Sequence, residues 1–273
     1  MLNDQVGLVV DYWMPAMPGQ VHRGMPSPWL TLVISYDDPV AVEWGPEQGR
    51  FRAAHRTLVG GLHRHATLLP QEEVQNGIQL DVSPFAAPAL FGVTAGEVSE
   101  QVVDLDALLG RRAGELADAL ADTGPGADRF RLIRSSLGRR LETASPTTAS
   151  RPEVRHAWTR IVDTNGRLPV SVVAEEVGWS RRHLAERMRR TTGFTPKQLA
   201  RTARFQHSRR LIMARVGSLA DVAYRAGYAD QAHLTAEWRE FAGCTPGAWM
   251  AAELPSLAGF PILQDDETAD AAS

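Results

Sequence analysis

The chain reads Val172-Val-Ala-Glu-Glu-Val-Gly178-Trp-Ser-Arg-Arg-His-Leu184 and, further along, Asp221-Val-Ala-Tyr-Arg-Ala-Gly227-Tyr-Ala-Asp-Gln-Ala-His-Leu234. A Gly-x-Thr-Pro segment follows each copy, at residues 193–196 and 243–246. The alanines and glycines of the two copies are 49 residues apart, whereas the leucines and the Thr-Pro pairs are 50 residues apart. The second copy therefore has one extra residue in its turn, and the repeat predicts two helix-turn-helix units.

The small residues of the repeat have a physical reason. Each unit packs one short helix tightly under another, so the crossing point favours a small residue, Ala174 or Ala223. The sharp turn that follows favours a residue that tolerates a positive φ, Gly178 or Gly227.

The helix starts and the buried faces can also be predicted. We expect Ser180 to cap the first recognition helix, and Ser218 with Asp221 to form a capping box at the start of the second unit. Large apolar residues at i, i+4 spacing place one face of each recognition helix in a core. These pairs are Leu184 with Met188 and Leu234 with Trp238. The opposite faces are left for a partner.

These opposite faces carry the candidate DNA-binding residues. In the first unit they are Ser180, Arg181, Arg182, Glu186, Arg189 and Arg190, and in the second Asp230, Gln231, Ala232, His233, Ala236 and Arg239. Arginine binds guanine through two hydrogen bonds and also contacts phosphate, while glutamate can accept from a cytosine amine. A charged helix face is often only solvated, but its repetition in two such units favours DNA binding. Because the second set has fewer cations, we expect the first helix to dominate affinity.

Residues from about 152 to 252 resemble the DNA-binding domain of the AraC/XylS family of transcriptional regulators. The resemblance rests on the two Ala-x-x-x-Gly-aromatic turns, the two Gly-x-Thr-Pro segments and the helix expected over 197–213. It implies that this helix, about 25 Å long, holds the two recognition helices one DNA turn apart. It also implies base contacts at Arg181, Arg182, Glu186, Gln231, Ala232, His233 and Ala236. Glu186 and Ala236 depart from the family pattern, which often has a long polar or basic residue at these positions.

Charge is divided unequally along the chain. Residues 151–256 contain 17 Lys and Arg against 10 Asp and Glu, while the other residues contain 12 against 22. A basic half beside an acidic half suits a regulator whose sensing part must stay off the phosphate backbone. We therefore expect an effector-binding or dimerisation domain over 1–142, a polar and flexible linker over 143–150, a DNA-binding domain over 151–256 and an acidic, disordered tail over 257–273.

Composition narrows the function classes. No stretch approaches the ~20 apolar residues of a membrane span, and no charged-then-apolar leader is present, so we expect a cytoplasmic protein. The single cysteine, Cys244, excludes an intrachain disulfide and a multi-cysteine metal site, and we expect it to be a buried filler. The sequence has no Gly-rich phosphate loop, Gly-x-Ser-x-Gly or His-Glu-x-x-His, so we expect neither catalysis nor a cofactor.

The first hundred residues have the pattern of an antiparallel β sandwich. Apolar runs at 6–10, 29–35, 57–60 and 78–82 alternate with Pro, Gly and Asp or Asn turn signals. The family resemblance implies a cupin-like domain that binds an effector, so the whole chain is expected to be α+β. Aromatic residues can line a pocket or fill the sandwich core. The candidate ligand-binding residues are Trp13, Trp29, Tyr36 and Trp44.

A metal site is not favoured in this half. His63 and His65 would share one face of a strand, as metal-binding histidines in a cupin do. The glutamate and glycine that the cupin pattern requires after them are not at the expected spacing. We therefore expect no metal.

Two amphipathic helices are predicted between the halves. Their stripes are Leu105, Leu108, Leu109, Leu116 and Leu120, and then Phe130, Ile133, Leu137 and Leu141. The stripes can pack against the sheet or across a homodimer, and the family resemblance favours dimerisation.

The sequence thus predicts a transcriptional regulator that binds double-stranded DNA in two successive major grooves. We expect a small organic effector in the N-terminal domain, with RNA polymerase as a further partner. The first alternative is a transcription factor whose N-terminal domain only dimerises or docks a protein. The second is an enzyme or sensor domain fused to the helix-turn-helix units, which would require convergent titratable residues in the N-terminal half.

Overall fold

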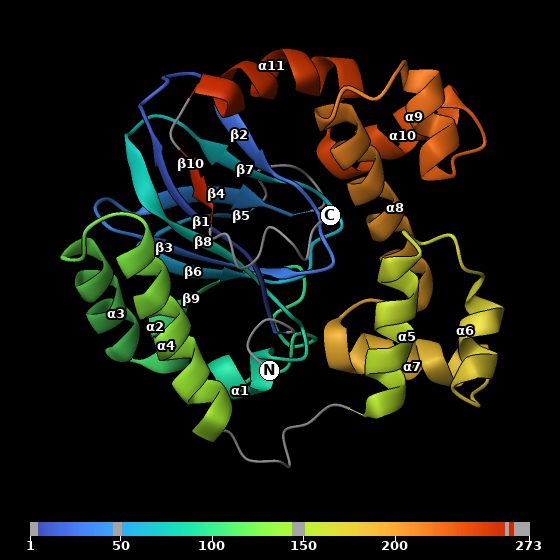
Figure 1. Ribbon diagram of the computed structural model, residues 1–273, viewed down its shortest axis with the longest axis horizontal. Coiled ribbons are helices and arrows are strands. Elements are labelled where there is room, and N and C mark those ends of the chain that lie inside the picture. Colours follow the sequence, from blue (N-terminus) through green and yellow to red (C-terminus); the bar gives the residue numbers. More distant parts are fainter. Residues whose placement is uncertain (1–4, 46–50, 144–150, 260–261, 265–273) are drawn as a thin grey trace.

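The structure of the chain is a computed structural model that describes residues 5–45, 51–143, 151–259 and 262–264. Figure 1 shows two parts side by side, with the strands and helices α1 to α4 in one and helices α5 to α10 in the other. Helix α11 runs back from the helical part over the strands. The chain is α+β in the order that the sequence predicts.

Two antiparallel sheets form the N-terminal sandwich. The six-stranded sheet has the order β10 (Ile262–Gln264), β1 (Val6–Met14), β8 (Gln75–Val82), β3 (Leu30–Ser35), β6 (Thr57–Gly60) and β9 (Val102–Asp104). The four-stranded sheet has the order β2 (Val21–Gly24), β7 (Thr67–Pro70), β4 (Val40–Trp44) and β5 (Phe51–His55). Strands β1, β3, β6 and β8 cover the four apolar runs, so the predicted sandwich is confirmed.

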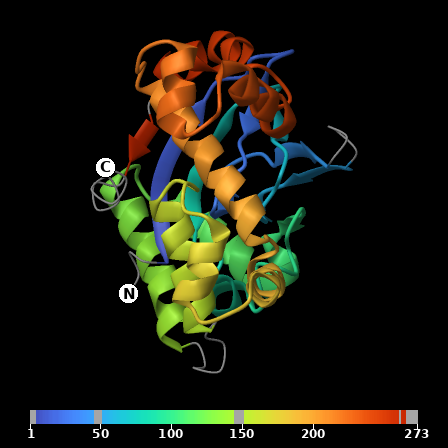
Figure 2. The ribbon, with the colours of Figure 1, turned by 90° about the vertical axis from the view of Figure 1, so that its right-hand side faces the viewer.

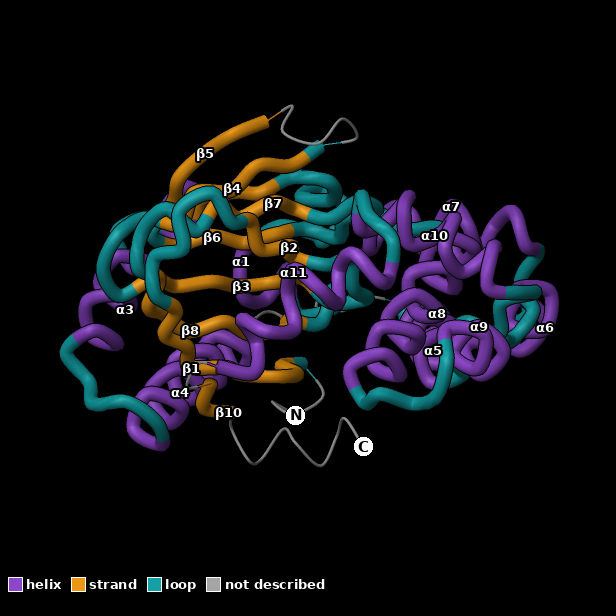
Figure 3. Tube along the Cα trace, turned by 90° about the horizontal axis from the view of Figure 1, so that it is seen from above, coloured by secondary structure: helices purple, strands orange, loops and turns teal. Residues whose placement is uncertain are grey.

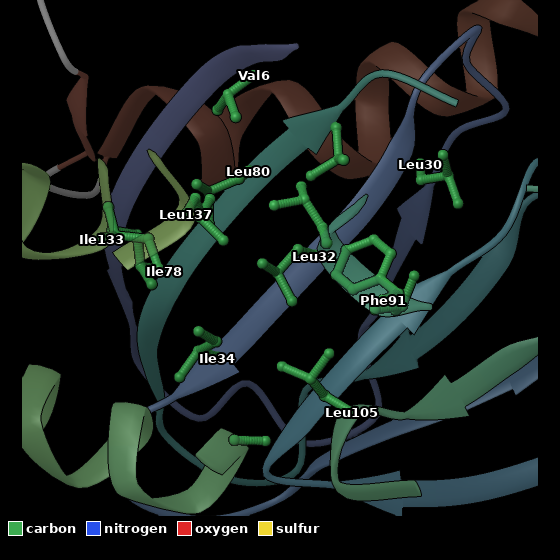
Figure 4. Close-up of a cluster of buried hydrophobic side chains, with 14 of the residues drawn as sticks. Val6, Leu30, Leu32, Ile34, Ile78, Leu80, Phe91, Leu105, Ile133 and Leu137 are labelled. Atoms are coloured by element: carbon green, nitrogen blue, oxygen red, sulfur yellow. The ribbon is translucent and has the colours of Figure 1, made fainter. Parts of the chain in front are cut away.

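Alternation along the strands builds two cores. Leu32 and Ile34 of β3 point to a core that helices cover, whereas Val33 between them joins the core between the two sheets. The covering helices are α1 (Ala87–Phe91), α2 (Leu105–Leu109), α3 (Arg112–Ala121) and α4 (Ala127–Thr143). Figure 4 shows Ile133 and Leu137 of α4 beside Ile78 and Leu80 of the sheet.

The amphipathic stripes differ from the prediction in two respects. The first stripe is split between α2 and α3, because Gly110 has φ 62° and ends α2. Its end residues Leu105 and Leu120, like Ile133 and Leu137 of the second stripe, are buried in the helix-side core of the same chain. These residues of the stripes therefore pack inside the domain, and dimerisation stays a prediction.

Helices alone form the C-terminal part. They are α5 (Pro152–Asp163), α6 (Val170–Glu176), α7 (Arg181–Thr192), α8 (Pro196–Met213), α9 (Leu219–Ala226), α10 (Gln231–Ala242) and α11 (Pro246–Gly259). The first unit consists of α6 and α7 and the second of α9 and α10, and α8 is the predicted connector. Gly178 and Gly227 have φ of 70° and 84°, while Ala174 and Ala223 are buried. The two predicted turns are confirmed.

The repeated Gly-x-Thr-Pro segments join one helix to the next. Gly193 and Gly243 end α7 and α10 in the left-handed region. Thr195 then caps α8 in a capping box with Gln198, with proline as the first helical residue. In the second copy the Thr245 hydroxyl accepts the backbone N–H of Ala248. Each segment therefore ends one helix and begins another within four residues.

The two parts share their cores. Leu62 and Phe85 of the N-terminal part pack with Trp158 of α5 and with buried residues of the first unit. Met25 packs against the core of the second unit, in which Cys244 is partly buried. Residues 143–150, predicted as a linker, begin at the end of α4 and otherwise lie outside the described residues.

The predicted disordered tail is regular where it is described. Residues 257–259 end α11, and Ile262–Gln264 form β10, which pairs with β1 through Val10 to Tyr12. Backbone pairing with an open edge of the sheet orders these residues, and no local composition signal would reveal it. Residues 265–273 lie outside the described part of the chain.

Candidate nucleic-acid interface

Helices α7 and α10 lie on one side of the connector α8. Figure 2 shows them on the same side of the obliquely running α8, and Figure 3 shows the same arrangement from above. Connector α8 has 18 residues and therefore spans about 27 Å. The two predicted recognition helices thus lie on one side of the same straight helix, with α10 packed on its middle through Arg201, Arg204 and Ser208.

The start of α7 presents two unpaired cations. Ser180 caps the helix by accepting the backbone N–H of His183, as predicted. Arg181 and Arg182 follow it and are exposed, with no ion-pair partner among the described residues. An N-terminal position in a recognition helix is the one that reaches base edges.

The middle and end of α7 are arranged differently. Glu186 is paired with Arg190 at 2.7 Å, so its carboxylate is already compensated. Arg189 and Arg190 are exposed, but they lie in the last turn, next to the N-terminal part.

The second recognition helix has a smaller and less basic surface. Asp230 caps α10 by accepting the backbone N–H of His233 at 2.7 Å. The other candidates, which are Gln231, Ala232, His233, Ala236 and Arg239, are all exposed. The exposed face expected from the sequence is therefore present in both units.

One shared feature of the units was missed in the sequence. Trp179 packs edge-on against His183 with ring centroids 4.7 Å apart, and Tyr228 packs in the same way against His233 at 5.2 Å. The aromatic residues follow the turn glycines, and each histidine is the third residue of its recognition helix. Their recurrence in both copies was the available signal. These contacts orient an imidazole at the start of each recognition helix.

Ion pairs hold α10 against the connector. Glu237 is buried and accepts Arg201 at 2.8 Å and Arg204 at 3.0 Å. Arg201 also bonds Glu240, and these bonds lower the pKa of the Glu240 carboxyl. Because a buried charge is tolerated only when it is paired, these contacts fix α10 relative to α8.

A comparable link joins α6 of the first unit to α5. The Arg160 guanidinium donates two hydrogen bonds of 2.9 Å to Glu176, and His156 contributes a third contact at 3.1 Å. Together they lower the pKa of Glu176 to about 2, with the Arg160 hydrogen bond as the largest cause.

The N-terminal part contacts both recognition helices at equivalent positions. The Gly96 N–H donates to the Thr191 carbonyl of α7, and the Ala66 N–H donates to the Phe241 carbonyl of α10. His65 adds a contact from its Nδ1 to the Glu240 carbonyl at 3.0 Å. Thr191 and Phe241 are 50 residues apart, the spacing of the repeat. The C-terminal ends of both helices, whose carbonyls lack helical partners, are thus bound by the N-terminal part.

The four candidate ligand-binding aromatics lie in separate places. Trp13 is 43% exposed, and Trp29 lies beside Gly7. Tyr36 is buried in the helix-side core, where its hydroxyl donates to Asp11. Trp44 packs on the core between the sheets. The structure does not bring the four side chains together around one space.

The described residues contain neither a candidate metal-binding cluster nor a helix that could span a membrane. No group of three or more His, Cys, Asp or Glu side chains within the described ranges could hold a metal ion. His63 is partly buried, and desolvation lowers its pKa, while His65 contacts α10, so the two histidines have different surroundings. Across the same ranges, no helix has the length and hydropathy needed to cross a bilayer.

Comparisons with solved structures cover both parts of the chain. The structure of ToxT from Vibrio cholerae O395 covers 94% of this chain and 100% of its own, with 10% identity and a TM-score of 0.54. ToxT bound to (E)-4-(8-methylnaphthalen-1-yl)but-3-enoic acid is 10% identical with a TM-score of 0.52, and the match covers 91% of this chain and 99% of that one. Wild-type ToxT from Vibrio cholerae strain SCE256 with a bound unsaturated fatty acid is 9% identical with a TM-score of 0.50, and the match covers 90% of this chain and 95% of that one. The sandwich followed by two helical units is therefore the fold of ToxT.

Sequence comparisons concern the helical part. Residues 173–252 match a family model described as a helix-turn-helix domain, which spans both predicted units. A search of curated protein sequences finds no match. With its doubled motif, its connector helix and this family match, the helical part of the chain is an AraC-type helix-turn-helix domain of a DNA-binding transcriptional regulator.

Proposed function

We propose that this regulator binds one DNA duplex through α7 and α10, which enter two successive major grooves. The observation that carries the proposal is the placement of both recognition helices on one side of α8, with their exposed faces free. Successive major grooves on one side of B-DNA are about 34 Å apart. A rigid connector of about 27 Å that holds both helices on one side is of the same scale as this repeat.

The residues divide into base-reading and anchoring sets. Arg181 and Arg182 of α7 read bases, together with Gln231 and His233 of α10, because they lie in the first turn of each helix. Arg189, Arg190 and Arg239 anchor phosphates from the later turns. Ser180 and Asp230 act through capping, and Glu186 and Ala236 line the reading faces between these groups.

Selection from a random DNA library tests this proposal. The full chain should enrich two short sequence elements about one DNA turn apart, and inserting about 5 bp between them should weaken binding because it turns one element to the far side of the duplex. Enrichment of a single element, or indifference to spacing, would contradict simultaneous use of both helices.

We further propose that a small organic molecule with an apolar body regulates the protein from the N-terminal sandwich. Support comes from the shared fold with ToxT, whose structures include an unsaturated fatty acid and a naphthalenyl butenoic acid as bound molecules. Val33, Val40, Val42 and Leu58 pack between the two sheets. Their apolar side chains are of the kind that surrounds an apolar ligand.

A thermal-shift screen of the full chain tests the effector. A ligand that binds only the folded protein should add about 2.7 kcal/mol of stability at a hundredfold excess over its dissociation constant. A matched panel of fatty acids, aromatic acids and sugars separates the chemical classes. If no class shifts the melting temperature, the alternative is favoured, in which the N-terminal domain dimerises or docks a protein; sedimentation would then identify a dimer.

A further inference from the structure

A groove lies between the two helix-turn-helix units. Its volume is about 550 Å³, and its walls come from the loop before α6, from α8 and from α10. On the α10 side the wall includes His233 and Ala236, which belong to the predicted base-reading face. The groove therefore adjoins the DNA-facing surface, on the side of α10 that looks towards the first unit.

The first wall is held rigidly on the connector. A Cβ on Gly166 would lie 1.9 Å from the Ala200 carbonyl oxygen, so only glycine permits this close approach. Beside it, Arg210 donates to the Asn165 side chain at 2.7 Å. The loop that carries Arg167 is thus fixed against α8.

Most charges of the groove are already compensated. Arg201 and Arg204 are bound to Glu237 and Glu240, so these four side chains carry no net charge together. Lys197 and Arg167 also line the groove and are exposed, and within the described residues neither has an ion pair. Two cations therefore remain for an anionic partner.

The geometry of duplex DNA identifies that partner. A recognition helix in the major groove is flanked on both sides by phosphate strands, because the groove is about 12 Å wide. When the exposed face of α10 enters a major groove, the strand towards the first unit must pass over the wall formed by Lys197 and Arg167. The same strand borders the minor groove that separates the two major grooves.

We propose that Lys197 and Arg167 bind the phosphate backbone between the two recognition sites, independently of base sequence. This inference rests on the proposed binding of both helices to one duplex. The contact anchors the protein at the centre of its site, where neither recognition helix reaches. Two phosphate contacts also make affinity depend more steeply on salt.

Lys197 offers a direct test because it is the only lysine in the sequence. The full chain is treated with an amine-acetylating reagent, with and without a saturating random-sequence 30-bp duplex, and acetylation of the Lys197 peptide is followed by mass spectrometry. A contact with phosphate should slow acetylation of Lys197 at least several-fold. Equal rates with and without bound duplex would overturn the proposed Lys197 contact.

Salt dependence tests both cations together. For Lys197→Gln and Arg167→Gln, the slope of log affinity against log salt should fall by about 0.9 each, equally for random and selected duplexes. Lys197→Arg should retain the wild-type slope, and Arg131→Gln, on the exposed surface of α4, is the matched control. If the wild-type chain binds DNA but both groove variants keep the wild-type slope, the inference is overturned and the proposed function is not. A wild-type chain that binds no duplex would overturn both.

Discussion

Arg182 combines exposure with the absence of an ion pair among the described residues, so it can contact DNA without first losing another bond. Arg190, another arginine of α7, is instead paired with Glu186. Residues of the same type on one helix are therefore unequal. Arg182→Ala should lose more sequence preference than Arg190→Ala.

Arg182→Ala should weaken the free energy of binding to the selected duplex by about 1–3 kcal/mol and relax the sequence preference at one base pair. Gel-shift titration against the selected and a scrambled duplex measures it, with Arg131→Ala as control. An equal loss on both duplexes would assign Arg182 to phosphate only, and no loss on either would remove it from the interface.

Gly96 is a second position where one residue decides a contact. A Cβ there would lie 2.4 Å from the Arg190 carbonyl oxygen at the end of α7. Because a backbone atom cannot move away cheaply, Gly96→Ala should lower the melting temperature. Gly114→Ala is the matched control, since nothing lies within 4 Å of its Cβ and alanine favours the α3 helix by about 0.5–1 kcal/mol. A melting temperature for Gly96→Ala at or above that of wild type would contradict the close contact.

At the scale of elements, the link between α5 and α6 should respond to acid. The folded-state pKa of Glu176 is about 2, below its ordinary value of 4.5, so its contribution to stability is present above pH 4.5 and is lost as pH falls towards 2. Glu176→Gln should therefore lower the melting temperature at pH 7 and have little effect near pH 2. A pH series of thermal unfolding for both proteins measures this, and a pH-independent difference would contradict it.

Local patterns predict most elements, and tertiary contacts explain the rest. The turn glycines, the helix caps at Ser180 and Ser218 and the four apolar strands depend on neighbouring residues, so the sequence is sufficient to place them. The break at Gly110 was missed because a leucine stripe continues through it, and glycine is compatible with helix as well as with a turn. Strand β10 and the Gly96 contact join residues far apart in sequence, so no period reveals them.

In the candidate site, too, some properties follow from the local sequence and others depend on tertiary contacts. Exposure of the reading faces follows from helical spacing, because the apolar pairs at i, i+4 fix which face is buried. Which cations remain available does not follow, because Arg201 and Arg204 meet Glu237 from another helix. The sequence therefore predicts the exposure of the candidate DNA-binding residues, but not that Lys197 and Arg167 are the groove's cations without an ion pair among the described residues.

At the scale of the whole molecule, Phe85 joins the two parts into one structure. Its ring packs edge-on against Trp158 of α5 at 5.8 Å, and the Arg155 guanidinium lies over it at 4.7 Å. Both parts lose buried contacts when this ring is removed, so Phe85→Ala should lower the free energy of unfolding by up to about 3–5 kcal/mol. The two parts should then unfold independently. Hydrogen exchange in increasing denaturant measures the coupling. In the wild type, amides of α5 and of β3 should open together, whereas in Phe85→Ala those of α5 should open at lower denaturant. If the two sets already open separately in the wild type, the shared core does not couple the parts, and an effector in the sandwich would need another route to the recognition helices.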